Sequence, residues 1–369
     1  MTSKSVGQCL HMLDIWQFFV LISRCTHLSF GIFWGMKYMN SIKFSIVPHN
    51  KISHIICVLH TMFGCLSKEQ EELLILVWVW PYGEHFPLDI CESMYGVSGC
   101  RLTADRNLYN VADALVVHHF DIMYSQSSLP QKPRPHFQHW VWFNMEPPVI
   151  ITNLHFLDNL FNLTMTFRED SDICRPYGRI EALKALQNFT IPAKSKLVSW
   201  VVSKWNAGSP RVKYYEAFKK HIQIDIYGRG NRKLSSDDFH DTISQYKFYL
   251  SFENSIYTAY ITEKFWSNAL STYAVPVVLG PSRQNYERFI PGDAFIHVDD
   301  FPSPKDLAAY LHDLDKDDER YKKYFNWRSK YRVKMEDGWA PHYCITCERL
   351  RRRRDYQTIP SVAKWFLEK

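Results

Sequence analysis

The stretch that decides the fold is Tyr246–Pro281, YKFYLSFENSIYTAYITEKFWSNALSTYAVPVVLGP. Its pattern predicts a strand at Lys247–Phe252, a polar loop at Glu253–Tyr260, a helix at Ile261–Leu270 and a second strand at Val275–Leu279. Such alternation indicates a βαβ unit of a parallel sheet, in which ligands bind at the carboxyl ends of the strands.

Polar side chains gather where the first of these strands ends and the helix is expected to begin. The free backbone N–H groups and the dipole of a helix start favour an anion, and a lysine beside them suits a diphosphate. A plain connecting loop, with Thr262 capping an ordinary helix, is the alternative interpretation. The side chains concerned are those of Glu253, Asn254, Ser255, Tyr260, Glu263 and Lys264.

Working outward, similar alternation covers most of the chain. We expect two α/β domains, 73–190 and 191–369, each with a parallel sheet covered by helices. A helix at Pro304–Leu314 begins with Ser303 as its N-cap. The further strands are expected at Leu73–Trp80, Ala114–Val117, Trp140–Asn144, Leu197–Val202, Ile222–Ile226 and Phe295–Val298.

Length and charge narrow the function classes. The 369 residues suit two domains. The net charge of +6, from 44 basic and 38 acidic residues, is too mild to indicate a nucleic-acid partner. The basic run Arg349–Arg354 is predicted to be a solvated helix face.

Cysteines and sequons indicate a secretory compartment. The nine cysteines include one CxxC pair, Cys344 and Cys347, and the missing second pair argues against a zinc site. Asn162-Leu-Thr and Asn188-Phe-Thr are N-glycosylation acceptors if lumenal. Disulfides are therefore favoured over metal binding, and Cys174 is predicted to be a buried free thiol.

The N-terminal part offers two candidate membrane anchors. Ile15–Met36 is long enough but is interrupted by Arg24, whereas Ile52–Leu66 has only 15 residues but carries no Lys, Arg, Asp or Glu. Lysines precede the second candidate and glutamates follow it, which places the N-terminus in the cytosol. We expect an anchor at 52–66, a short stem at 67–72, and a cytosolic tail or unrelated extension at 1–51.

Several long motifs together resemble those of one family. From about Leu73 to Lys369 the chain resembles the α1,3-fucosyltransferases of vertebrates, and IPAKSK (Ile191–Lys196) is similar to the leukocyte-type members that make sialyl Lewis x. The resemblance implies a GT-B fold, two Rossmann-like domains facing a cleft, behind a type II signal anchor in the Golgi membrane. The matching motifs are Tyr246–Pro281, ILVWVWPYG (Ile75–Gly83), WVWFNMEPP (Trp140–Pro148), FNLTMTFREDSDICRPYGR (Phe161–Arg179), WVVSKWN (Trp200–Asn206), VPVVLGPSRQNYERFIPGDAFIHVDDF (Val275–Phe301) and YFNWR (Tyr324–Arg328).

Fucosyl transfer from GDP-β-L-fucose needs a base and cationic groups for the leaving diphosphate. Glu146 ends a strand-like segment before two prolines, and apolar surroundings suit a carboxylate for a general base. The family's catalytic Glu stands in an ESP triplet, here EPP. Arg211 and Lys264 are the candidates for the phosphates. Asn254, Tyr260 and Glu263 are implied to hold the donor's ribose, fucose or guanine.

The resemblance also implies an acceptor site in the 73–190 domain. His119 and Phe120 lie in a matching HHFD segment, in which relatives carry Arg or Trp at the place of Phe120. The expected acceptor is the 3-hydroxyl of N-acetylglucosamine in (sialyl-)N-acetyllactosamine of glycoproteins or glycolipids. The bridges implied are Cys91–Cys344 and Cys100–Cys347, with local pairing inside each segment as the alternative. The implied bridges would tie the final segment of the 191–369 domain back to the first domain.

A short acidic motif raises the question of a metal. Asp170-Ser-Asp172 is similar to the DxD motif that holds manganese in many sugar-nucleotide enzymes, but GT-B enzymes rely on basic residues and helix ends, so a structural role is favoured. No cofactor is expected to be required, although Mn²⁺ could stimulate without a dedicated site. The competing hypotheses are an inert, lectin-like or chaperone relative and a transferase of another nucleotide sugar.

Overall fold

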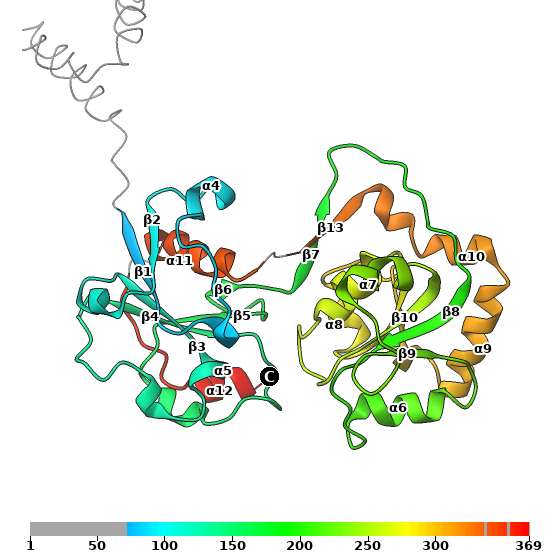
Figure 1. Ribbon diagram of the computed structural model, residues 1–369, viewed down its shortest axis with the longest axis horizontal. Helices are drawn as coiled ribbons and strands as arrows, with labels where there is room; N and C mark the ends of the chain where they lie inside the picture. Colours follow the sequence, from blue (N-terminus) through cyan, green and yellow to red (C-terminus); the bar gives the residue numbers. More distant parts are fainter. Residues whose placement is uncertain (1–71, 336–337, 353–354, 369) are drawn as a thin grey trace, which may run out of the picture. The chain divides into compact units, whose positions relative to one another are not determined.

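The computed structural model describes residues 72–335, 338–352 and 355–368. The sheets drawn in Figure 1 belong to the unit Gln70–Lys369, which holds all of these residues. The predicted tail at 1–51, the anchor at 52–66 and nearly all of the stem at 67–72 lie outside the described residues. Within the described ranges, no helix combines the length and the apolar character needed to cross a bilayer.

The first lobe is built on six parallel strands in the order β2-β1-β3-β4-β5-β6. Both β3 and β4 are buried along almost their whole length, as expected for parallel strands covered on both faces. The six strands are β1 (Leu73–Val77), β2 (Cys100–Thr103), β3 (Ala114–His118), β4 (His139–Asn144), β5 (Leu163–Thr166) and β6 (Ile173–Cys174). Of these, β1, β3 and β4 confirm the predicted strands to within three residues, whereas β2, β5 and β6 were not predicted.

The second lobe is built on five parallel strands in the order β12-β11-β10-β8-β9. The predicted βαβ unit is confirmed, because β10 and β11 pair in parallel from Phe248 with Val275 to Phe252 with Leu279. The strands are β8 (Lys196–Val201), β9 (Asp225–Tyr227), β10 (Tyr246–Phe252), β11 (Val275–Leu279) and β12 (Ile296–His297).

Helices cover both faces of this second sheet. Leu250 and Val277 pack with α6 (Pro210–Phe218) and α9 (Pro304–Asp315) on one face, and the adjacent Tyr249 and Val278 face the opposite layer. In Figure 1, α6 and α9 lie on the side of the strands opposite α7 (Ser236–Ile243). The Ser303 side chain caps α9 by accepting from Asp306 N, as predicted. The remaining helices of the lobe are α8 (Arg283–Glu287), α10 (Asp318–Lys323) and the 3-10 turns η6 (Val298–Asp300) and η7 (Asn326–Ser329).

The helix between β10 and β11 differs from the prediction. It is a π-helix, η5 (Lys264–Leu270), and starts three residues later than expected. Thr262 precedes it, and its carbonyl accepts from Phe265 N and Trp266 N at 3.0 and 3.3 Å while its N–H and hydroxyl both donate to the Glu253 carboxylate. The Trp266 ring packs so closely on Gly178 that a Cβ added there would lie only 2.6 Å from it. The buried Glu253 carboxylate therefore fixes Thr262 at the start of the helix.

The end of the chain returns to the first lobe. After β13 (Tyr331–Met335), which pairs antiparallel with β7 (Gly178–Ala182), α11 (Ala340–Arg352) packs on β1 and β2 and α12 (Val362–Leu367) joins the same core. Disulfides join Cys91 to Cys344 and Cys100 to Cys347, which confirms the implied pairing over local bridges. Other short helices of this lobe are α4 (Cys91–Tyr95), α5 (His119–Ile122), η1 (Pro81–Gly83), η2 (Arg106–Asn110), η3 (Gln126–Ser128) and η4 (Leu154–Leu157).

The prediction of a buried thiol at Cys174 is wrong. Cys174 is free, but its side chain is exposed. It lies on β6, a two-residue strand at the edge of the first sheet, where Ile173 faces the core and the next side chain faces solvent.

Candidate active site

A pocket of about 380 Å³ lies where strand ends of both sheets meet. It receives side chains from the loops after β1, β4, β8 and β10, from η5, and from the segment before α11. The structure thus brings together all the side chains predicted for catalysis and donor binding, namely Glu146, Arg211, Asn254, Tyr260, Glu263 and Lys264.

Glu146 is fixed by the turn that ends β4. The buried Asn144 side chain donates to the carbonyl of Glu146 and accepts from its N–H, at 2.7 and 3.3 Å. The Tyr82 hydroxyl donates to Glu146 Oε1 at 2.7 Å. Burial and the nearby carboxylate raise the pKa of Tyr82 far above its usual value, so Tyr82 remains a hydrogen-bond donor. One carboxylate oxygen of Glu146 is therefore held by Tyr82, and the other has no hydrogen bond to any described residue.

Arg211 is buried at the start of α6, directly after Pro210. Its side chain is 6 % exposed, and Nη2 donates to the Lys204 carbonyl at 2.6 Å. Burial lowers the pKa of Arg211, and the charge of Glu253 only partly offsets this. Arg211 Nε and Asn254 Oδ1 are both buried without a hydrogen-bond partner among the described residues. Because buried polar groups are usually hydrogen-bonded, an unpaired donor and an unpaired acceptor in one pocket indicate a binding site for a polar ligand.

Lys264 stands between two carboxylates. Its Nζ lies 3.3 Å from Glu253 Oε2 and 2.9 Å from Glu263 Oε1, and it also donates to the Thr262 hydroxyl. Burial opposes its charge, but both carboxylates outweigh that effect and raise the pKa of Lys264. Burial likewise raises the pKa of the fully enclosed Glu253, and Lys264 limits the rise. The lysine is therefore a fixed cation at the floor of the pocket.

Aromatic side chains form the walls of the pocket, and two of them, Tyr82 and Trp339, were not predicted from the sequence. Tyr260 is only 3 % exposed and packs on Phe167 and Tyr177, so it contributes an edge to the pocket. Tyr82 follows η1's Pro81 with a φ of 53°, a rare left-handed backbone for a tyrosine that sequence does not reveal. Trp339 arrives with the returning C-terminal segment and packs against Tyr82 at a ring distance of 5.7 Å.

Of the two residues predicted to bind the acceptor, only Phe120 lies beside the pocket. Phe120 is half-buried and packs on the Tyr82 ring at 4.9 Å, beside the pocket. His119 is not brought to the pocket, because its side chain has no exposed surface and its Nε2 is bonded to the Thr152 carbonyl. Burial lowers the pKa of His119 to about 4. A direct contact of His119 with an acceptor is thus incompatible with this arrangement.

The two predicted N-glycosylation sites differ in how exposed their asparagines are. Asn188 is exposed in the segment between β7 and β8, where a glycan has room. Asn162 is 1 % exposed, and its amide N donates to the Gln357 carbonyl. The folded chain therefore does not support the predicted glycosylation at Asn162, since the amide that would carry the glycan is enclosed.

The Asp170–Asp172 motif has structural partners. Asp172 accepts from both the N–H and the hydroxyl of Thr164 and pairs with Arg349, and Asp170 pairs with Arg168. These contacts agree with the structural role predicted for the motif. Among the residues that the structure describes, no cluster of three or more His, Cys, Asp or Glu side chains could hold a metal ion.

Two protein-family models match most of the described part of the chain. The model of the N-terminal fucosyltransferase domain matches residues 70–178, and that of the C-terminal domain of glycosyltransferase family 10 (fucosyltransferase) matches residues 191–365. The chain belongs to glycosyltransferase family 10. The boundary between the two matches falls within the segment that joins the two lobes.

Curated relatives cover most of this family 10 chain. It is 52 % identical over 299 residues to 3-galactosyl-N-acetylglucosaminide 4-alpha-L-fucosyltransferase FUT3 of Pan troglodytes, with 80 % of each chain covered. It is 50 % identical over 299 residues to 4-galactosyl-N-acetylglucosaminide 3-alpha-L-fucosyltransferase FUT5 of Homo sapiens, again with 80 % of each covered. It is 48 % identical over 332 residues to 4-galactosyl-N-acetylglucosaminide 3-alpha-L-fucosyltransferase 9 of Rattus norvegicus, covering 90 % of this chain and 91 % of that one.

Solved structures confirm the fold. A crystal structure of an alpha1,3-fucosyltransferase with GDP-fucose superimposes with a TM-score of 0.52 at 19 % identity, covering 79 % of this family 10 chain and 94 % of that chain. The same enzyme class with GDP gives a TM-score of 0.51 at 18 % identity, over 80 % and 94 % of the two chains. The two-lobed GT-B architecture predicted for this chain is therefore shown.

Proposed function

We propose that this chain transfers L-fucose from GDP-β-L-fucose to the 3-hydroxyl of N-acetylglucosamine in N-acetyllactosamine glycans, with inversion at the sugar carbon. The observation that carries the proposal is the pocket in which Glu146 of the first lobe faces Arg211 and Lys264 of the second. Family membership supports fucosyl transfer, and the 3-alpha-L-fucosyltransferase names of the relatives from Homo sapiens and Rattus norvegicus support the 3-hydroxyl, whereas the FUT3 relative is named for the 4-position.

Glu146 is the proposed general base. The Tyr82 hydroxyl occupies Oε1, so Oε2 is the atom offered to the acceptor hydroxyl. As the hydroxyl oxygen forms its bond to the fucose carbon, its proton passes to Glu146 Oε2. A general base held within hydrogen-bond reach typically raises the rate of a reaction by a factor on the order of 10²–10⁴.

Arg211 and Lys264 are the proposed stabilisers of the leaving group. When the bond from fucose to the β-phosphate oxygen breaks, GDP takes the electron pair and negative charge grows on the diphosphate. Arg211 Nε, which has no partner among the described residues, can donate to a phosphate oxygen, and Lys264 supplies a fixed positive charge. Such preorganised charges act more strongly in a pocket than in water.

The donor's uncharged parts are assigned to the remaining residues. Asn254 Oδ1 lacks a partner and can accept from a ribose or fucose hydroxyl, while the exposed part of Glu263 can accept from another. Tyr260 is proposed to close the pocket wall against the fucose ring. No metal cofactor is proposed to be required, because the two cations meet the charge that the reaction develops.

The cellular setting is part of the proposal. We infer a single-pass type II protein of the Golgi membrane, with the catalytic part in the lumen acting on glycoprotein or glycolipid acceptors. Both disulfides tie segments about 250 residues apart, with separations of 253 and 247, and such bridges persist in an oxidising compartment.

A transfer assay on the protein tests the proposal. It would use GDP-fucose with N-acetyllactosamine, its α2,3-sialylated form and the type 1 isomer, each with and without Mn²⁺ or a chelator. Transfer to the 3-hydroxyl of the type 2 acceptors, unaffected by the chelator, is the expected result. Folded protein that binds GDP but transfers to none of them would favour an inert relative, and use of another nucleotide sugar would favour a different transferase.

A further inference from the structure

Tyr82 contacts the proposed base from a backbone conformation that is unfavourable for a tyrosine. Its φ is 53° and its ψ is 23°, in the left-handed region that residues with a side chain rarely adopt. From there its hydroxyl donates to Glu146 Oε1 at 2.7 Å. A backbone of this kind persists only where its surroundings fix it, and such residues cluster at functional sites. The contacts that fix Tyr82 therefore also decide where the Glu146 carboxylate points.

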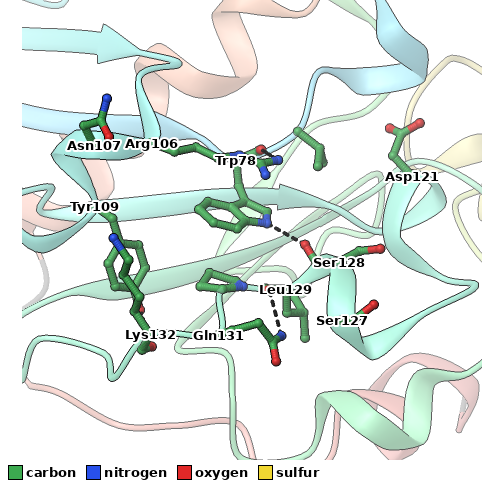
Figure 2. Close-up of a pocket in the computed structure, with 12 residues that line it drawn as sticks. Trp78, Arg106, Asn107, Tyr109, Asp121, Ser127, Ser128, Leu129, Gln131 and Lys132 are labelled. Atoms are coloured by element: carbon green, nitrogen blue, oxygen red, sulfur yellow. Dashed lines mark hydrogen bonds between the residues drawn. The ribbon is translucent and has the colours of Figure 1, made fainter.

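One of these contacts is a carboxylate from another element. Asp121, in α5, accepts from the backbone N–H of Tyr82 through Oδ2 at 3.0 Å. The same Oδ2 lies 2.5 Å from His118 Nδ1, and because a carboxylate only accepts, Nδ1 carries the proton of this bond. Figure 2 shows a neighbouring pocket of about 540 Å³, in which Asp121 stands apart from the side chains gathered around Trp78. One oxygen of Asp121 thus joins His118 to the backbone of Tyr82.

His118 is itself immobilised at the end of β3. Its side chain has no exposed surface, and its ring packs on Phe143 at 4.9 Å and on Tyr82 at 4.8 Å. Strands β3 and β4 pair in parallel with His118 opposite Phe143, which precedes Glu146 by three residues. Two neighbouring strand ends therefore hold the base, since β4 carries Glu146 and β3 fixes its carboxylate through Asp121 and Tyr82.

We propose that Asp121 is a positioning residue for fucosyl transfer, which acts on the Glu146 base through Tyr82. It keeps Tyr82 in the left-handed conformation, so that the hydroxyl takes Oε1 of Glu146 and leaves Oε2 directed at the acceptor. The inference rests on the proposed function, in which Glu146 is the base. A misplacement of about 1 Å at a reacting group can cost a rate roughly a hundredfold, so a residue two contacts away from the base can control turnover.

A direct contact with the acceptor is the competing role for Asp121, which is half-buried and lines the pocket in Figure 2. The two roles predict different kinetics. A contact with the acceptor raises the KM for the acceptor when it is removed, and its effect does not depend on the Tyr82 hydroxyl. Positioning of the base lowers kcat, leaves that KM near the value of the parent protein, and depends on the hydroxyl.

The test is a double-mutant cycle on kcat, at saturating GDP-fucose and N-acetyllactosamine. Tyr82→Phe keeps the ring and removes the hydroxyl, whereas Asp121→Ala removes the oxygen that holds the Tyr82 backbone. Each change alone should lower kcat roughly ten- to hundredfold, with the KM for the acceptor near that of the parent. The double variant should lose no more than the larger single loss, because both changes act on one contact.

Two further variants separate positioning from folding. Asp121→Asn keeps an oxygen that can accept from both Tyr82 N and His118 Nδ1, so it should recover most of the kcat that Asp121→Ala loses. Asp89→Ala changes an exposed aspartate ahead of α4, outside both pockets, and is the matched control that should keep full activity.

Three kinetic results would overturn the inference. These are losses of kcat that multiply in the double variant, a raised KM for the acceptor with unchanged kcat, and full activity of Asp121→Ala. The ¹⁹F NMR signal of 3-fluorotyrosine placed at position 82 gives a readout that needs no turnover. This signal should shift with Asp121→Ala and with Glu146→Ala, but not with Asp89→Ala.

The same experiments separate the inference from the proposed function. A protein that transfers no fucose, but whose fluorine signal shifts with Asp121→Ala, would refute the proposed function and keep the positioning of Tyr82 by Asp121. An active enzyme that needs Glu146, but whose kcat and fluorine signal ignore Asp121→Ala, would refute the positioning role and keep the function.

Discussion

Replacing Arg211 with methionine separates a role in ligand binding from a role in folding. Methionine keeps most of the apolar volume of the buried stem but removes the guanidinium. The loss of the Nη2 hydrogen bond to the Lys204 carbonyl destabilises the free protein by about 1 kcal/mol or more. The removal of the unpaired, buried Nε donor relieves a cost of about 1–3 kcal/mol. Because the two effects oppose each other, the stability of the free protein should change by no more than about 1 kcal/mol.

Binding of GDP should respond very differently. A hydrogen bond between the Arg211 guanidinium and a phosphate contributes about 1.5–3 kcal/mol, so the Kd for GDP should rise roughly 10- to 150-fold. Calorimetric titration with GDP and chemical unfolding without it measure the two effects separately. Arg229→Met, in the exposed loop after β9, is the matched control and should change neither. A variant of Arg211 that binds GDP normally but loses several kcal/mol of stability would refute the reasoning, because Arg211 would then be a structural residue.

Three further changes probe the same structure. Lys264→Met leaves the buried Glu253 without its cation, so the raised pKa of Glu253 should rise further. The contribution of Glu253 to the free energy of unfolding should therefore fall more steeply between pH 5 and 8 in the variant than in the parent protein, and urea unfolding of both proteins across this range measures the difference; equal pH dependence in the two would contradict this. Replacing both Cys91 and Cys344 with alanine leaves the neighbouring bridge closed, so thermal unfolding should show that the free energy of unfolding falls by about 3 kcal/mol. A fall as large as that caused by removing both bridges would contradict this. His119 has a folded pKa of about 4, below its unfolded value, so it stays neutral in the fold while the unfolded chain binds a proton below pH 6.5. His119 should therefore contribute a fall in stability of about 2 kcal/mol from pH 7 to 5, beside the fall due to the buried His342, whose pKa is also lowered. His119→Gln should lessen the total fall by about 2 kcal/mol, and an unchanged fall would contradict the burial of His119.

Sequence analysis located the site mainly through family resemblance, because a carboxylate or an arginine in a loop carries little signal by itself. Local patterns agree with that placement, since Glu146 and Asn254 each follow a buried strand by two residues and the carboxyl ends of parallel strands meet at one edge of a sheet. Alternation of strands and helices predicted the five strands of the second sheet but only β1, β3 and β4 of the first. The identity of the bridged cysteines came from family resemblance and not from spacing, since their separations exceed any local signal.

What was missed depends on contacts between distant segments. The cysteine bridges implied by the resemblance predicted that the chain returns to the first lobe, but no pattern in the sequence places Trp339 at the pocket. The Glu253 carboxylate fixes Thr262 just before η5, and a helix-period pattern shows neither this contact nor the π-helical form. His119 matched a family segment, but its burial follows from how α5 packs on β4.

The central claim is that Glu146 takes the acceptor's proton in fucosyl transfer, and the most direct test is the turnover of Glu146→Gln at saturating GDP-fucose and N-acetyllactosamine. Glutamine can still accept from Tyr82 but cannot take up the proton, so kcat should fall on the order of a hundred- to ten-thousand-fold while the Kd for GDP stays unchanged. Glu92→Gln, on the exposed side of α4, is the matched control and should retain full activity. A Glu146→Gln protein with kcat near that of the parent would contradict the account.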